Sequence, residues 1–287
     1  MPTAKPVSPS HASLGTVRTL PITRPLHWLA LGWRDMRRCG GISVAHGLAL
    51  ALFGAVLLTV AHHRFWLLAG AFSGFLLMAP VLATSLYALS RALMLGEPAN
   101  TRVVVRTWLA WQREHGSKWS NDYWCMVQFG ALLALAGTGW VITSAALITL
   151  LAPVPITTPL EFARHVVLAK QGWLFELWLA MGGVLAAPVF ASTAVAMPLL
   201  LDRRVTLLQA VLTSWRAVLA NPLPMALWAT VIMVLTLIGL LSGLLGLIVV
   251  MPILGHASWH AYCDLVDRAS LPQRDTAPIT PKASESS

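Results

Sequence analysis

Long apolar runs separated by short polar segments dominate the chain. Six runs, at about 42–61, 65–89, 124–151, 173–201, 223–241 and 244–263, each contain at most one charged residue. A helix of about 20 residues rises roughly 30 Å, the thickness of the hydrocarbon core of a bilayer. The pattern therefore predicts an all-α polytopic membrane protein with six transmembrane helices.

An amphipathic segment too short and too charged to span precedes each pair of apolar runs. In the first segment Leu26, Leu29, Trp33 and Met36 recur three or four residues apart, which is one face of a helix. The same spacing places Leu208, Val211, Trp215 and Val218 on one face, and a weaker copy (Val104, Thr107 and Trp111) lies in a helix expected over 101–115. We expect these helices in the membrane interface, with Trp28 and Trp33 at headgroup level.

Polar residues before these segments predict where the helices begin. Thr23, Asn100 and Asp202 are each placed to cap one of the three amphipathic helices. Between the third and fourth spans, Thr158 and Glu161 have the spacing of a capping box, with proline between them at the first helical position. This predicts a short surface helix over 159–171.

A glycine lies six residues before a proline in the second, fourth and sixth runs. The pairs are Gly74 and Pro80, Gly182 and Pro188, and Gly246 and Pro252. Proline removes a backbone hydrogen bond and bends a helix, and glycine lets a neighbouring helix approach closely. We interpret the chain as three helical hairpins that repeat in the same sense, each made of an interfacial helix, a span and a kinked span. Chance repetition in an apolar sequence is the alternative.

Composition and charge fix the environment and the orientation. The chain is 57% hydrophobic and 11% charged, whereas a soluble domain has about 25% charged residues. Of its 20 Lys and Arg residues, all but Arg64, Arg164 and Lys170 fall on one side of the predicted spans. Because basic residues stay in the cytoplasm, we expect both termini to be cytoplasmic. The net charge of +9 then predicts contact with anionic lipid headgroups and requires no nucleic acid.

Both ends of the chain lack the apolar pattern. Residues 1–22 and 269–287 are polar and rich in proline, serine and threonine, and we expect them to be disordered cytoplasmic tails. Residues 23–268 then form one transmembrane domain.

The end of the sixth run carries the candidate chemistry. His256, His260 and Asp264 are four residues apart and share one helix face, and His46 is expected at the same depth in the first span. Two imidazoles and a carboxylate can hold a metal or relay a proton. The alternative is that these side chains meet water, lipid phosphate or a neighbouring helix. No motif for a hydrolase, a metalloprotease or a nucleotide site occurs, so we expect no enzyme and assign no catalytic residue and no cofactor.

Three segments resemble a known family. They are Leu-Gly-Trp-Arg-Asp at 31–35, Leu-Met-Ala-Pro at 77–80 together with Tyr87, and the stretch 252–262 around His256 and His260. On these residues the chain, over about 24–268, resembles the uncharacterised bacterial integral membrane proteins called domain of unknown function 2189. The resemblance implies a six-helix inner-membrane protein and brings no established activity and no functional residues.

Three functions stay open from the sequence. The expected one is a non-enzymatic protein that binds lipids or an unidentified membrane-protein partner. The second is a small-solute or ion permease, and the third is a metal- or haem-binding protein that uses His46, His256 and His260. The middle of each predicted span is almost wholly Gly, Ala, Leu, Val and Ile, which favours the first.

Overall fold

The computed structural model describes residues 14–61, 82–113, 124–169 and 173–273. Within these ranges the chain is helical apart from loops and two isolated bridges, as an all-α fold requires. The longer helices are α1 (Arg24–Cys39), α2 (Gly41–Ala61), α4 (Thr84–Met94), α5 (Thr101–Arg113), α6 (Trp124–Leu151), α8 (Leu174–Thr193), α10 (Leu207–Ala220), α11 (Pro222–Leu241) and α12 (Leu247–Leu265). The short elements are α7 (Pro159–Phe162), a π-helical turn at Ala163–Val167, α9 (Ala196–Asp202) and a 3-10 turn at Arg268–Ser270.

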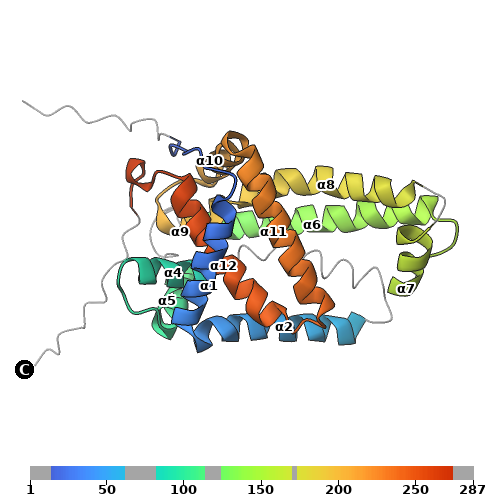
Figure 1. Cartoon of the computed structure of the whole chain (residues 1–287), viewed down its shortest axis with the longest axis horizontal. Coiled ribbons are helices and arrows are strands. Elements are labelled where there is room, and N and C mark those ends of the chain that lie inside the picture. The colour runs from blue at the N-terminus through green and yellow to red at the C-terminus, as the bar shows by residue number, and fades with distance from the viewer. Residues whose placement is uncertain (1–13, 62–81, 114–123, 170–172, 274–287) are drawn as a thin grey trace, which may run out of the picture.

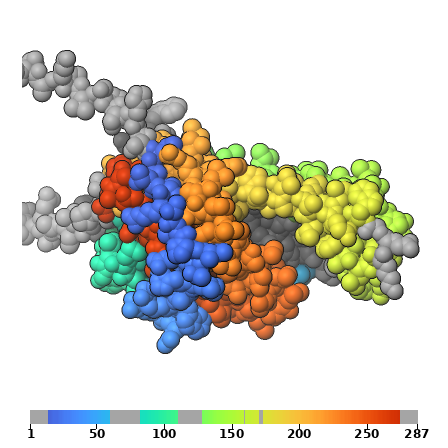
Figure 2. Space-filling model, turned by 45° about the horizontal axis from the view of Figure 1, so that its top comes forward, coloured from blue at the N-terminus to red at the C-terminus, as the bar shows by residue number. Residues whose placement is uncertain are grey.

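Helix α12 lies at the centre of the packing. It contacts α1, α2, α4, α9 and α11. Helices α6 and α8 pack side by side and extend away from the other helices as an arm, with α7 near its far end (Figure 1). Figure 2 shows the same arm projecting from the body that α1, α2, α11 and α12 form. One end of the molecule is therefore a body of several helices packed around α12, and the other is an arm of two helices.

Glycines let three helices approach α12 closely. A Cβ on Gly32 of α1 would overlap the backbone of Ile253 and Ala257, and one on Gly47 of α2 would overlap the carbonyl of Ile248. A Cβ on Gly255 of α12 would lie 2.5 Å from Leu86 of α4. At Gly32 and Gly47 the neighbouring backbone leaves no room for a Cβ, so these two positions require glycine, whereas a Cβ at Gly255 would require the Leu86 side chain to shift.

The main hydrophobic core is built from buried side chains of α1, α9, α10, α11 and α12, with further ones from α4 and α6. Trp28 is fully buried and its ring stands edge-on to that of Trp228, with centroids 5.7 Å apart. The expectation that Trp28 lies at headgroup level is therefore wrong, because protein covers it on all sides. Trp33 is 46% exposed, as an interfacial side chain would be.

In the part of the chain that the structure describes, four helices are long and apolar enough to cross a membrane. They cover Gly41–Thr59, Gln128–Leu151, Leu174–Asp202 and Pro222–Leu241. Six spans were expected. Residues 62–81 of the second predicted span lie outside the described residues, and its last part forms the buried start of α4. The sixth coincides with α12, which is not among the four because its second half is polar and buried in protein.

Two pairs of long helices pack against each other. α11 and α12 pack against each other across the turn at 242–246, and α6 packs against α8. Most of the partner expected for α2, up to residue 81, lies outside the described residues.

The predicted kink positions fall in different settings. Pro188 lies inside α8 and Pro252 inside α12. Gly182 faces Trp140 of α6, which a Cβ would touch at 3.0 Å, whereas Gly246 precedes α12 as its N-cap and packs in the turn against Ser242 and Gly239. Gly74 and Pro80 lie outside the described residues.

Two of the four predicted caps are confirmed. The Asn100 side chain accepts from the N–H of Arg102, and Thr158 and Glu161 form both halves of their capping box. The helix behind this box ends at Val167 rather than at 171. Thr23 precedes α1 as expected but makes no side-chain cap bond.

The prediction for Asp202 is wrong. The capping box of α10 is formed by Thr206 and Gln209. Asp202 ends α9 instead, where its carboxylate is buried.

Residues 14–22, which belong to the expected amino-terminal tail, pack on the body of the protein. The N–H of Arg18 donates to the carbonyl of Leu265 at 2.9 Å, and Val17 pairs with Val266. The Asn221 side chain accepts from the N–H of Leu20 at 2.7 Å and donates to the carbonyl of Arg18 at 2.9 Å. At the other end the described chain continues to residue 273, with Leu271 buried.

Candidate functional site

A buried carboxylate on α1 joins three helices. Asp35 is 2% exposed, although the neighbouring side chains Arg34 and Arg37 are exposed. Its Oδ2 accepts a hydrogen bond from Ser90 Oγ of α4 at 2.9 Å and lies 2.7 Å from His260 Nε2 of α12. Burial raises the pKa of Asp35, but the bonds and charges of its partners outweigh it and leave the pKa below its ordinary value.

The hydrogen bonds around His256 have a definite direction. Ser90 has one hydroxyl proton and gives it to Asp35, so its oxygen accepts from His256 Nδ1, 2.7 Å away. In the neutral imidazole Nε2 is then the acceptor, and Ser43 Oγ donates to it at 2.8 Å. Ser43 therefore donates to His256, His256 donates to Ser90, and Ser90 donates to Asp35. This chain links α1, α2, α4 and α12, and each of its side chains is at least nine-tenths buried.

A second buried carboxylate lies at the end of α9. Asp202 accepts from Arg91 Nε at 2.8 Å, from Arg203 Nε at 3.0 Å and from the Tyr262 hydroxyl at 2.8 Å. Arg91 is 14% and Arg203 13% exposed, so the two guanidinium groups neutralise the charge where water is scarce. This cluster ties α4 and α12 to α9.

Asp264 holds the other end of α1. Its carboxylate accepts from Arg24 Nε at 2.6 Å and from the indole N–H of Trp28 at 2.7 Å. Burial raises the pKa of Asp264, but these two donors outweigh it and lower the pKa below its ordinary value. Together with the pair of Asp35 and His260, this contact fixes α1 along the length of α12.

The residues predicted to hold a metal or relay a proton, His256, His260, Asp264 and His46, do not share one site. His256 and His260 do meet at one centre through Ser90 and Asp35, whereas Asp264 turns to α1 and His46 bonds elsewhere. In the described ranges, no three His, Cys, Asp or Glu side chains gather as a metal site requires. The arrangement supports hydrogen bonding between helices rather than metal coordination.

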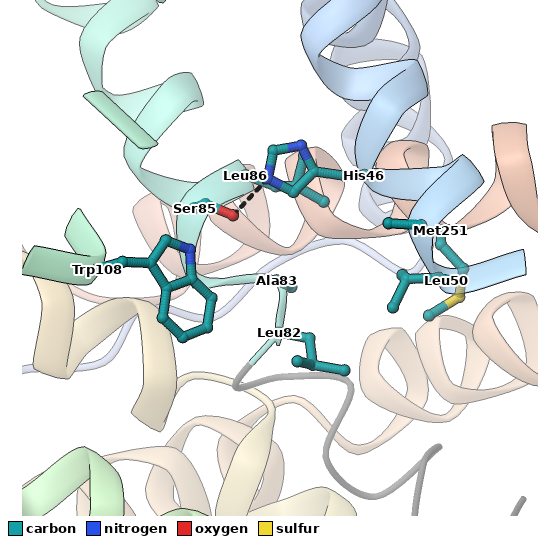
Figure 3. Close-up of a pocket in the computed structure, with 9 residues that line it drawn as sticks. His46, Leu50, Leu82, Ala83, Ser85, Leu86, Trp108 and Met251 are labelled. Atoms are coloured by element: carbon teal, nitrogen blue, oxygen red, sulfur yellow. Dashed lines mark hydrogen bonds between the residues drawn. The ribbon is translucent and has the colours of Figure 1, made fainter. Parts of the chain in front are cut away.

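His46 lines a pocket between α2, α4, α5 and α12. Its Nδ1 lies 2.8 Å from the carbonyl oxygen of Ile42, and its Nε2 lies 2.7 Å from Ser85 Oγ. Figure 3 shows this pair on the pocket wall, with Trp108 of α5 and Met251 of α12 on opposite sides. The pocket has a volume of about 170 Å³ and is otherwise lined by apolar side chains.

Sequence reasoning missed the acceptors and hydroxyls that complete these clusters. They are Asp35, Ser43, Ser85, Ser90 and Asp202. Asp35 is the only acidic residue in α1 and lies among three arginines, so its position in the sequence already marked it as unusual. The serines carried no such signal, because serine is common in apolar helices.

The chain was compared with known families and proteins. Residues 67–202 match a family described as predicted integral membrane protein (DUF2189). This match confirms the resemblance seen in the sequence and includes the segment 77–80 and Tyr87, while the segments 31–35 and 252–262 lie outside it. No curated protein and no solved structure gives a significant match.

Proposed function

We propose that this predicted integral membrane protein is a non-enzymatic component of the bacterial inner membrane that binds anionic phospholipids at the cytoplasmic ends of its spans. The observation that carries the proposal is the surface of its amphipathic helices. On α1, α5 and α10, exposed apolar stripes lie beside exposed arginines.

Helix α1 shows the pattern on its outer face. Leu26 and Trp33 are 54% and 46% exposed, and Arg34, Arg37 and Arg38 are exposed beside them. Arg37 and Arg38 pair with no acidic side chain in the described part of the chain, and Arg34 has only Asp35 at 3.7 Å. Apolar side chains that enter the acyl region beside cationic groups at the phosphates are typical of interfacial helices.

Helix α10 repeats the pattern. Leu208, Leu212, Trp215 and Leu219 follow one another at helical spacing and are exposed, with Arg216 next to them. The opposite face of α10, with Ala210, Thr213, Ser214 and Ala217, packs against the protein. The face that carries most of the large apolar side chains is thus the one left uncovered.

Helix α5 supplies the third surface. Val105, Trp108 and Leu109 are exposed, and Arg102 lies on the same helix. A basic residue near an anionic membrane surface contributes about 1 kcal/mol of binding. Three such helices at one end of the bundle therefore favour anionic over zwitterionic lipid.

The orientation belongs to the same proposal. In this proposal these helices and both termini are cytoplasmic and six spans form three hairpins, and the distribution of basic residues supports that orientation. The packing of α6 on α8 and of α11 on α12 supports two of the hairpins. The exposed apolar faces of α6 and α8 also leave room for a membrane-protein partner.

A permease has less support. Its substrate path needs polar groups at mid-membrane on several helices. Among the described residues, α8 and α11 carry no buried polar side chain and α6 carries only Ser144, which accepts from the indole N–H of Trp178, whereas several lie in α4 and in the second half of α12. A metal or haem protein has less support too, since the Nε2 atoms of His46 and His256 each bond a serine.

Native mass spectrometry of the purified protein with mixed phosphatidylglycerol and phosphatidylethanolamine tests the proposal. We expect the wild type to retain phosphatidylglycerol preferentially and the triple variant Arg34→Gln, Arg37→Gln, Arg38→Gln to lose most of that preference. Arg164→Gln, at an exposed arginine beyond the far end of α6, is the matched control and should change nothing. Equal retention of the two lipids by the wild type would refute it.

A further inference from the structure

We propose that the pocket between α2, α4, α5 and α12 holds a segment of one acyl chain of an anionic phospholipid, whose phosphate lies at the arginines that end α1. This inference rests on the lipid binding proposed above and says where one such lipid is seated. The residues that line the pocket are shown in Figure 3.

The pocket wall presents apolar surface to a ligand. Its aliphatic side chains are Ala49, Leu50, Leu82, Ala83 and Leu86, with the thioether of Met251. The two ring nitrogens of His46 are already bonded, Nδ1 to the carbonyl of Ile42 at 2.8 Å and Nε2 to Ser85 Oγ at 2.7 Å. Ser85 itself is fully buried, so its hydroxyl is not offered to a ligand. A wall of this kind suits a hydrocarbon chain, because a polar group placed against it would lose its hydrogen bonds to water.

The size of the pocket sets how much of the lipid it takes. Its volume is about 170 Å³. An apolar protein cavity of about 150 Å³ holds benzene, which has six carbon atoms. The pocket therefore takes a stretch of about six carbons of one acyl chain, and the rest of the lipid stays outside it.

The mouth of the pocket lies on apolar surface that α2 and α5 expose. Trp108 of α5 is 38% exposed, and Ala49 is exposed on α2, which is long and apolar enough to span. Leu48 and Leu52, on either side of Ala49 along α2, are 44% and 58% exposed. An acyl chain of the surrounding bilayer therefore reaches the mouth without crossing polar surface.

The end of α1 places cationic groups at a suitable height above this mouth. Arg37 and Arg38 are exposed just before α2 begins at Gly41, and in the described part of the chain neither pairs with an acidic side chain. His46 and Ala49 follow Gly41 at about 8 and 12 Å along the helix axis, at 1.5 Å per residue. The headgroup region of one leaflet is about 5–8 Å thick, half the difference between the whole bilayer and its hydrocarbon core. A phosphate at the two arginines therefore brings the first carbons of its acyl chains to the level of the pocket.

The two contacts reinforce each other. Once the phosphate is held, entry of the chain into the pocket is an intramolecular step with a high effective concentration. The seated chain then gains van der Waals contacts on all sides that a shallow groove would not give it. The protein should therefore retain one phospholipid more firmly than the lipids around it.

Two alanines of α2 give a matched pair of variants. Ala45 and Ala49 are both exposed and one helical turn apart, but only Ala49 lines the pocket. A phenylalanine ring at position 49 enters the mouth, whereas the same ring at position 45 lies on the outer surface of the helix. Any general effect of a larger side chain on α2 is shared by both variants.

Native mass spectrometry of the full-length protein with mixed phosphatidylglycerol and phosphatidylethanolamine is the test. We expect the wild type and Ala45→Phe to retain one firmly held phosphatidylglycerol. Its occupancy should fall about three- to tenfold in Ala49→Phe, because the contacts of about six carbons are lost. Equal retention by the two variants overturns the acyl-chain site and leaves the lipid proposal standing. A wild type without any preference for phosphatidylglycerol refutes the lipid proposal, and this inference with it.

A photoreactive phosphatidylglycerol locates the chain in the unsubstituted protein. With a diazirine in the carboxyl-end half of one acyl chain, we expect crosslinks at Ala49, Leu50 or Leu82, with a lower yield in the double variant Arg37→Gln, Arg38→Gln. Crosslinks spread evenly over the exposed faces of α2, α6 and α8 overturn the proposal. So does a free fatty acid that the purified protein retains in place of phosphatidylglycerol.

Discussion

His260 Nε2 lies 2.7 Å from Asp35 Oδ2, although 225 residues separate the two positions in the sequence. The contact joins the amphipathic helix before the first span to the last helix of the bundle. Because Ser90 and, through it, His256 meet at the same carboxylate, the three helices α1, α4 and α12 converge on Asp35.

Removing this carboxylate should destabilise the protein strongly. Asp35→Ala leaves the side chains of Ser90 and His260 without their acceptor in a buried site, and we expect a loss of about 3 kcal/mol in unfolding free energy. The measurement is thermal or denaturant unfolding in detergent, followed by tryptophan fluorescence. Asp267→Ala is the control, since its pair with Arg18 is exposed on both sides and should be worth less than about 1 kcal/mol.

Acid should weaken the fold through two carboxyls. The pKa values of Asp35 and Asp264 are below their ordinary value in the folded protein, so their contribution is fully present above about pH 4, the ordinary value of Asp. It is lost as the pH falls through the lowered folded values. We expect the melting temperature to drop steeply below about pH 4 and the drop to be smaller in the variant Asp35→Asn, Asp264→Asn. An unchanged drop in that variant would contradict this assignment.

A methyl group at Gly47 should be costly. It would overlap the carbonyl of Ile248, where α2 crosses α12, and overpacking of this kind costs about 1–3 kcal/mol. Gly183→Ala is the matched control, because a Cβ there meets no atom within 4 Å. We expect the melting temperature of the Gly47→Ala protein to fall below that of the wild type and that of the Gly183→Ala protein to stay near it. Equal melting temperatures of the two variants would contradict the close packing of α2 on α12.

Residues 14–22 should contribute to the stability of the fold. Deleting residues 1–22 removes two hydrogen-bond partners of Asn221, Arg18 and Leu20, and should lower the melting temperature. Asn221→Ala should reproduce much of this effect. If the protein without residues 1–22 melts at the same temperature as the full-length protein, the segment contributes nothing.

Helices and their local signals were predictable from the sequence, because they depend on residues close together in the chain. The spacing of Thr158 and Glu161 and the position of Asn100 gave correct caps. The Thr206 and Gln209 box was equally readable and was overlooked in favour of Asp202.

The partners of the buried polar residues were not predictable. His256 and His260 were singled out correctly as a pair on one face of α12, but nothing in the sequence says that Asp35 rather than Asp264 lies opposite them. That choice depends on how α1 docks on α12, which Gly32 and the ring contact of Trp28 with Trp228 fix over long range. A hydrogen bond between side chains more than 200 residues apart depends on how the helices pack. The periodicity of apolar residues within one helix does not predict it.

Lipid binding at the cytoplasmic ends of the spans requires α1, α5 and α10 to face the cytoplasm. Cysteine labelling in intact cells measures this orientation directly. Cys39, Cys125 and Cys263 are first replaced by alanine, and a single cysteine is then introduced by Glu97→Cys, between α4 and α5, or by Leu160→Cys, in α7 beyond α6. We predict that a membrane-impermeant maleimide labels the Leu160→Cys protein in intact cells and the Glu97→Cys protein only after lysis. Labelling of the Glu97→Cys protein from outside would contradict the account.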